Sequence, residues 1–208
     1  MNEIKAIIFD LDGVLVEAKD WHYEALNQAL GLFGFTISRS DHLVTYDGLP
    51  TTKKLQMLSR DQGLPKELHS FINKLKQKYT LEIINTKCRP VFHHEYALSN
   101  LRRDGFKLGC ASNSIGTSVE IMLRKSNLLD FMDVILSTDD VENPKPNPEI
   151  YIKSFELLNL KPENCLIIED NVNGIKSAKS SKAHVMEIRE IEEVNYENIK
   201  NHIKKIES

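Results

Sequence analysis

The sequence is poor in cysteine, has a single tryptophan, and lacks both a long apolar run and a large excess of charge of either sign. Its three cysteines (Cys88, Cys110 and Cys165) are too few and too widely spaced for a disulfide framework or a zinc site. A formal net charge of -3 is not the basic composition of a nucleic-acid-binding domain. The first apolar run, residues 4–9, is too short for a signal peptide or a membrane span. We therefore expect a cytoplasmic protein that binds neither nucleic acid nor membrane, and its oligomeric state stays open.

Short apolar runs are present instead, with helical patterns between most of them. The first, residues 5–10, is continuously apolar, which is typical of a strand buried on both faces of a parallel sheet. Similar runs follow at residues 107–111, 133–137, 165–169 and 183–188. This alternation of strands and helices predicts an α/β fold built on a doubly wound parallel sheet.

Strand signals are missing between the first two of these runs. Asp20 is placed to cap a helix, and Pro65 is placed to open another. We therefore expect a small α-helical domain, residues 17–87, inserted into an α/β core domain that consists of residues 1–16 and 88–208.

Polar side chains follow the predicted strands, at the edge of the sheet where open parallel sheets bind their ligands. They are Asp10, Asp12, Ser112, Asn113, Lys145, Glu169 and Asp170. Two unit charges about 4 Å apart repel by about 4 kcal/mol at an effective dielectric of 20, so clustered carboxylates bind a cation or hold protons. Oxygen ligands shared with a substrate phosphate suit Mg2+. We expect Asp170 to bind it directly and Glu169 to bind through water or as a weaker ligand.

Phosphoryl transfer assigns a role to each remaining group. Asp10 is the predicted nucleophile, because a carboxylate can attack phosphorus and form an acyl-phosphate that water hydrolyses. Asp12 is the predicted acid and base for the leaving alkoxide and the attacking water. Ser112 and Asn113, with nearby backbone N–H groups, are predicted to bind the phosphoryl oxygens, and Lys145 to neutralise charge on phosphate and nucleophile. Each fragment alone also occurs in ordinary turns, so the prediction depends on their joint occurrence in this order.

Together these segments resemble the four motifs of the haloacid dehalogenase superfamily. Asp10-Leu-Asp-Gly-Val-Leu-Val resembles the first motif, Ser112 the second, Lys145 in Lys-Pro-Asn-Pro-Glu-Ile-Tyr the third, and Ile-Ile-Glu169-Asp170-Asn-Val-Asn-Gly the fourth. The resemblance implies a Rossmann-like sheet with a helical cap, and Asp10 and Asp12 as nucleophile and acid/base. It also implies Mg2+ held by Asp10, the backbone carbonyl of Asp12, Glu169 and Asp170. One departure is Lys182, which stands where relatives commonly have a helix-ending glycine.

Within the superfamily, the chain is similar to the group that contains sugar-phosphate phosphatases and β-phosphoglucomutase. His22 stands ten residues after Asp12, where that mutase has a cap histidine, and this favours mutase chemistry. Thr51 stands where the mutase has a phosphate-binding arginine. Lys53 or Lys54 is the candidate replacement, but a lysine ammonium does not reproduce the guanidinium fork of arginine. The difference therefore favours a substrate other than that of the mutase. We expect a Mg2+-dependent phosphatase for a small phosphorylated metabolite such as a sugar phosphate. A hexose-phosphate mutase and a non-catalytic phosphoryl-binding protein are the alternatives.

Overall fold

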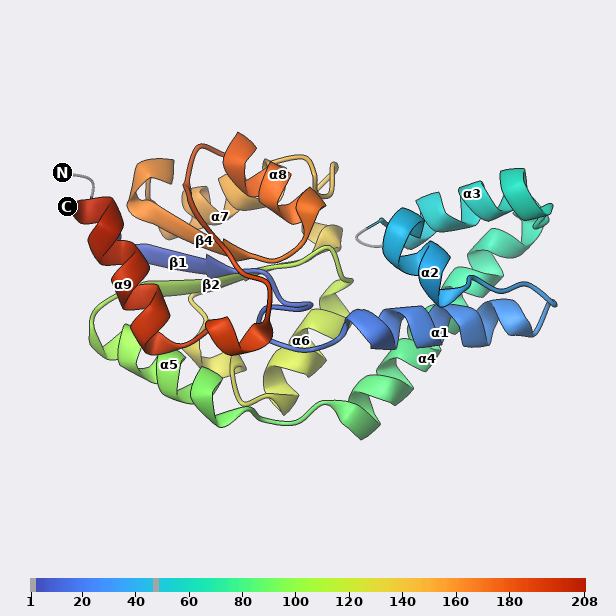
Figure 1. Ribbon diagram of the computed structural model, residues 1–208, viewed down its shortest axis with the longest axis horizontal. Helices are drawn as coiled ribbons and strands as arrows, with labels where there is room; N and C mark the ends of the chain where they lie inside the picture. The colour runs from blue at the N-terminus through green and yellow to red at the C-terminus, as the bar shows by residue number, and fades with distance from the viewer. Residues whose placement is uncertain (1–2, 47–48) are drawn as a thin grey trace. The chain divides into compact units, whose positions relative to one another are not determined.

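A parallel sheet of five strands organises the computed structural model, which describes residues 3–46 and 49–208. The strands are β1 (Ala6–Phe9), β2 (Lys107–Ala111), β3 (Val134–Leu136), β4 (Cys165–Glu169) and β5 (His184–Glu187). Their order across the sheet is β3-β2-β1-β4-β5, and every neighbouring pair is parallel (Figure 1). The chain winds outward in opposite directions from β1, which is the predicted Rossmann-like, doubly wound topology. The predicted α/β fold class is confirmed.

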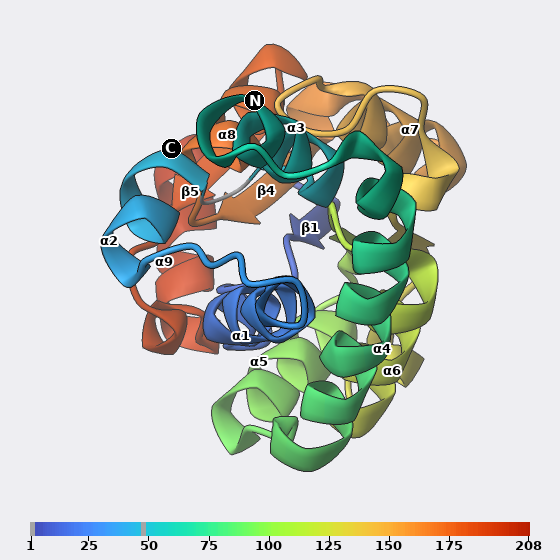
Figure 2. The ribbon, with the colours of Figure 1, turned by 90° about the vertical axis from the view of Figure 1, so that its right-hand side faces the viewer.

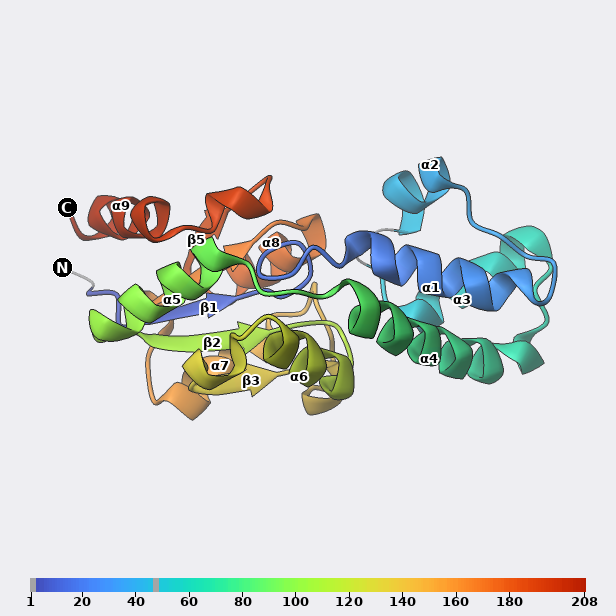
Figure 3. The same cartoon turned by 90° about the horizontal axis from the view of Figure 1, so that it is seen from below.

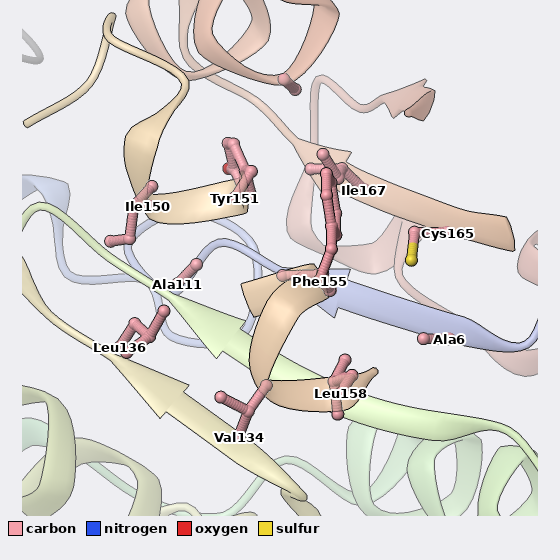
Figure 4. Packing of buried hydrophobic residues seen from close by; sticks show 12 residues of the cluster. Ala6, Ala111, Val134, Leu136, Ile150, Tyr151, Phe155, Leu158, Cys165 and Ile167 are labelled. Carbon is pink, nitrogen blue, oxygen red and sulfur yellow. The ribbon is translucent and has the colours of Figure 1, made fainter. Parts of the chain in front are cut away.

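Helices cover both faces of this sheet, which explains why its strands are apolar on both sides. On one face lie α7 (Glu149–Leu158) and α8 (Val172–Ser180), and on the other lie α5 (Phe92–Arg103), α6 (Gly116–Lys125) and α9 (Tyr196–Glu207) (Figures 1 and 2). Figure 4 shows Tyr151 and Phe155 of α7 over Ile167 of β4 in one buried cluster. Each such side chain contributes roughly 1.5–3 kcal/mol when it is fully buried. This packing makes the strand ends rigid supports for the side chains that follow them.

Two units emerge from the contacts within the chain: Met1–Glu17 with Cys88–Ser208, and Ala18–Lys87. The second unit consists of α1 (Lys19–Gly31), α2 (Arg39–Asp41), the π-helical turn η1 (His42–Tyr46), α3 (Thr51–Gln62), the 3-10 turn η2 (Lys66–Leu68) and α4 (His69–Lys87). Helices α1 and α4 lie side by side (Figure 3). They share with α3 a separate apolar core that includes Leu26, Leu58 and Ile72. Among the described residues, no helix is long and apolar enough to cross a membrane.

The predicted cap of the first helix is wrong. Helix α1 begins at Lys19, with Ala18 in the N-cap position and no side-chain cap hydrogen bond. Asp20 lies inside the first turn instead, where a carboxylate still interacts favourably with the helix dipole.

Lys182 ends α8 in a left-handed backbone conformation, with a φ of 67°. It directly follows Ser181, the C-cap residue of α8, and its side chain is exposed. Glycine is the usual residue at this position, because a Cβ atom in the left-handed region clashes with the neighbouring carbonyl oxygen. The lysine therefore keeps the glycine conformation at a cost in stability.

Lys182→Gly should raise the free energy of unfolding by about 0.5–1 kcal/mol, because it removes this clash and leaves buried contacts unchanged. Urea denaturation measures the change. Lys182→Ala is the matched control, since it removes the long side chain and keeps the Cβ atom; it should bring no gain. Equal stabilisation by both variants would contradict the explanation.

Candidate active site

A buried ion cluster lies at the carboxyl ends of β1 and β4. The Nζ atom of Lys145 is 2.6 Å from Oδ1 of Asp10 and 2.7 Å from Oε1 of Glu169, and it also donates to the backbone oxygen of Ala111 at 2.8 Å. Lys145 is 4% exposed and Glu169 is 1% exposed. The three N–H donors of the ammonium thus have three acceptors: Asp10 directly after β1, Ala111 at the end of β2 and Glu169 at the end of β4. An ammonium at this depth is stable only with such partners.

The charged groups in the cluster shift one another's pKa values. Burial alone would lower the pKa of the Lys145 ammonium, but Asp10 and Glu169 outweigh that effect and raise it above its ordinary value. Burial raises the pKa of Asp10 well above its ordinary value of 3.8, Lys145 opposes this rise, and Glu169, Asp12 and Asp170 add to it. More negative charge therefore surrounds Asp10 than one ammonium balances.

A divalent cation fits this excess of carboxylates. Asp10, Glu169 and Asp170 each offer a carboxylate oxygen, and these oxygens lie within 4.8 Å of one another. The donor set contains oxygen only, which is the preference of hard cations such as Mg2+. Three of the four carboxylates predicted to converge do so in the cluster. The carboxylate of Asp12 lies close enough to raise the pKa of Asp10, but its hydrogen bonds are to another segment.

Asp12 is held by the loop after β2. Its Oδ2 atom accepts hydrogen bonds from the Ser114 hydroxyl at 2.8 Å and the Ser112 hydroxyl at 3.3 Å. Gly13, with a φ of 93°, turns the chain directly after Asp12, and its N–H donates to the Val16 carbonyl at 2.7 Å. Few other residues adopt this φ without strain. Ser114 was missing from the predicted site, although it lies in the same Ser-Asn-Ser segment as Ser112.

The side chain of Asn113 is bonded to the backbone of Lys145. Its side-chain amide donates to the backbone oxygen of Lys145 at 3.2 Å and accepts from the Lys145 N–H at 3.0 Å. The side chain therefore holds the loop that carries Lys145, and the phosphate contact of Asn113 stays a prediction. Ser112 is fully buried, and its hydroxyl also accepts from the Ser114 N–H at 3.0 Å.

The two predicted cap residues lie in the helical unit. His22 of α1 has its Nδ1 atom 3.1 Å from Nζ of Lys76 in α4. Lys53, in the first turn of α3, is exposed, whereas Lys54 beside it is 8% exposed. The structure thus brings His22 together with a lysine that the sequence had not singled out, and it leaves Lys53 on the surface of its own unit.

The carboxylate of Glu169 occupies space that is open only because residue 174 of α8 is a glycine. A Cβ atom at residue 174 would lie 1.9 Å from Oε1 and 2.2 Å from both Oε2 and Cδ of Glu169. Real Cβ atoms do not approach so closely, and the carboxylate cannot retreat because Lys145 and Tyr151 hold its Oε1 atom. The glycine of the Asn-Val-Asn-Gly segment is therefore required by close packing.

Known proteins match the chain over most of its length. Residues 7–188 match the sequence model of the haloacid dehalogenase-like hydrolases. A phosphorylated carbohydrates phosphatase of Thermotoga maritima is 29% identical over 178 residues, covering 84% of this chain and 80% of that protein. The pyrophosphatase PpaX of Bacillus cereus is 27% identical over 172 residues, covering 83% of this chain and 77% of that protein. The crystal structure of β-phosphoglucomutase from Clostridium difficile has a TM-score of 0.83 at 23% identity, over 97% of this chain and 98% of that one, and shares its fold.

Gly174→Ala should destabilise the protein by about 1–3 kcal/mol, the usual effect of overpacking, because the added methyl group displaces the Glu169 carboxylate. Thermal unfolding measures the loss. Gly31→Ala is the matched control, since a Cβ atom at residue 31 meets nothing within 4 Å. An unchanged melting temperature for Gly174→Ala would contradict the placement of Glu169.

Proposed function

The chain belongs to the haloacid dehalogenase-like hydrolase family, and we propose that it is a Mg2+-dependent phosphatase that hydrolyses a small sugar phosphate through an aspartyl-phosphate on Asp10. Its relatives are named phosphatases, so the chain itself is a phosphatase that acts on a phosphorylated compound. The proposal of a sugar phosphate is supported by the relative named for phosphorylated carbohydrates. The observation that carries the mechanism is the buried contact of Asp10 with Lys145 beside Glu169 and Asp170.

The first chemical step uses Asp10 and Asp12. A carboxylate oxygen of Asp10 attacks the phosphorus atom of the substrate, a phosphorus–oxygen bond forms, and the bond to the sugar oxygen breaks. The protonated carboxyl of Asp12 gives its proton to the departing alkoxide. Lys145 holds the Asp10 side chain in place and offsets the negative charge that develops on the phosphoryl oxygens.

The second step reverses these roles. Water attacks the phosphorus atom, the Asp12 carboxylate accepts its proton, and the bond to Asp10 breaks to release inorganic phosphate. The hydroxyls of Ser112 and Ser114 keep the Asp12 carboxylate in one position between the two steps. Asp10, Asp170 and the Asp12 backbone carbonyl, with Glu169 through water or as a weaker ligand, would hold Mg2+, which would supply positive charge that lowers the repulsion between carboxylates and phosphate. Asp12 distinguishes this chemistry from that of a dehalogenase, which needs no such proton donor.

The test is a screen of sugar phosphates, nucleotides and other phosphometabolites for phosphate release with Mg2+. Asp10→Asn should lower turnover of the best substrate at least about a thousandfold, because an amide cannot form the acyl-phosphate. Removal of the metal with EDTA should abolish activity, and Mg2+ should restore it. Asp130→Asn, which changes an exposed aspartate, is the matched control and should behave as the unaltered protein. Unchanged turnover in Asp10→Asn would eliminate Asp10 as the nucleophile.

The same experiment separates a phosphatase from a mutase. A hydrolase turns a hexose phosphate into free sugar and inorganic phosphate, whereas a mutase returns an isomeric hexose phosphate when a trace of hexose bisphosphate is present. We expect free sugar and phosphate, analysed by anion-exchange chromatography, because Thr51 stands where the mutase has its phosphate-binding arginine. Isomerised sugar phosphate as the main product would favour the mutase and would indicate that His22 takes part in that reaction. Absence of turnover across the whole panel would favour a non-catalytic phosphoryl-binding protein.

A further inference from the structure

We propose that Tyr151 is a positioning residue of this site: its hydroxyl fixes Glu169 on Lys145 and thereby holds Lys145 on Asp10. The proposal rests on the proposed function, because it assigns Tyr151 an effect on phosphoryl transfer. In this proposal Glu169 anchors Lys145, and of the three carboxylates at the cation site Asp10 and Asp170 are the ones that would bind Mg2+ directly.

Tyr151 contacts both members of the buried ion pair. Its hydroxyl donates to Oε1 of Glu169 at 2.6 Å, and the face of its ring lies 4.8 Å from Nζ of Lys145. The side chain has no exposed surface and is packed in the apolar cluster beneath α7 (Figure 4). Burial, and then the negative charge of Glu169, raise the pKa of the phenol well above its ordinary value of 10.0, so the hydroxyl stays a donor. Tyr151 is therefore a rigid part of the core with one polar atom aimed at the site.

Glu169 has both oxygens engaged within the protein. Its Oε1 atom accepts from Lys145 at 2.7 Å and from Tyr151 at 2.6 Å. Its Oε2 atom accepts from the backbone N–H groups of Asp170 at 3.1 Å and Asn171 at 3.4 Å. Two hydrogen bonds at each oxygen use the lone pairs that a carboxylate offers. This arrangement suits a group that anchors an ammonium better than one that binds a metal directly.

The tyrosine hydroxyl is what keeps Oε1 turned toward Lys145. Without it, that oxygen would retain one hydrogen bond, and the nearby cation site would compete for it. Each of the three N–H donors of the Lys145 ammonium bonds to one acceptor, so a shift of Glu169 moves the ammonium relative to Asp10 and Ala111. The effect belongs to the transition state, where Lys145 offsets developing charge, and not to the initial binding of substrate.

Tyr151→Phe isolates the hydroxyl, because phenylalanine keeps the ring and its contact with Lys145. With p-nitrophenyl phosphate as the probe substrate, we expect kcat to fall about tenfold, the usual effect of losing one hydrogen bond to a charged group, while KM changes less than about twofold. Mg2+ affinity, measured by calorimetry, should not fall. Tyr196→Phe is the matched control, since Tyr196 donates to the carboxylate of Asp104 at 2.8 Å on the exposed surface of the same unit. It should leave kcat unchanged.

A double-mutant cycle tests whether Tyr151 acts through Glu169. In a Glu169→Gln background, Tyr151→Phe should change kcat less than about twofold, because the group that the hydroxyl positions is already altered. A tenfold loss in both backgrounds would overturn the proposal, as would an unchanged kcat in the single variant. If Tyr151→Phe no longer folds, the hydroxyl is needed for stability, and this result would also overturn the proposal. Failure of the proposed function looks different, because the unaltered protein would then be inactive or Asp10→Asn would be active.

Discussion

The placement of one buried ammonium, that of Lys145, sets the requirements for the rest of the site. A lysine that is 4% exposed needs all its donors satisfied, and Asp10, Glu169 and Ala111 satisfy them. These partners come from three neighbouring strands, so the strands must end at matching levels for the hydrogen bonds to form. The breaking of such a buried pair costs about 3–5 kcal/mol, because it leaves an uncompensated charge in the interior. Asn113 supports the same arrangement from the other side by holding the Lys145 backbone.

The strand order explains how these groups meet. Because β1 lies between β2 and β4, the residue after β1 is flanked by the ends of both neighbours. Asp10 is therefore surrounded by Ala111 and Ser112 on one side and by Glu169 and Asp170 on the other. The excess of negative charge follows from this geometry, and so does the need for a cation. The proposed metal site and the proposed nucleophile therefore lie at the same place because of a single topological feature, the central position of β1.

The proposed chemistry restricts the polar residues of the core unit more than those of the helical unit. The core unit is proposed to bind the phosphoryl group, which is the same in every phosphate ester, so that chemistry constrains its site residues. The helical unit has its own apolar core around Leu26, Leu58 and Ile72, and its polar groups are not constrained in this way. The pairing of His22 with Lys76 shows a polar contact built into that unit.

The sequence by itself determined the fold class and the positions of Asp10, Glu169 and Asp170 at strand ends, because continuous apolar runs identify strands of a parallel sheet and the next residue is then at its ligand-binding edge. It also indicated the helical insertion, since strand signals stop there. Only the tertiary structure decided that Tyr151 binds Glu169, that the Asn113 side chain holds Lys145, and that α1 starts without Asp20 as its cap. These contacts depend on side-chain conformations and loop paths, which packing between distant segments sets and local sequence patterns do not specify.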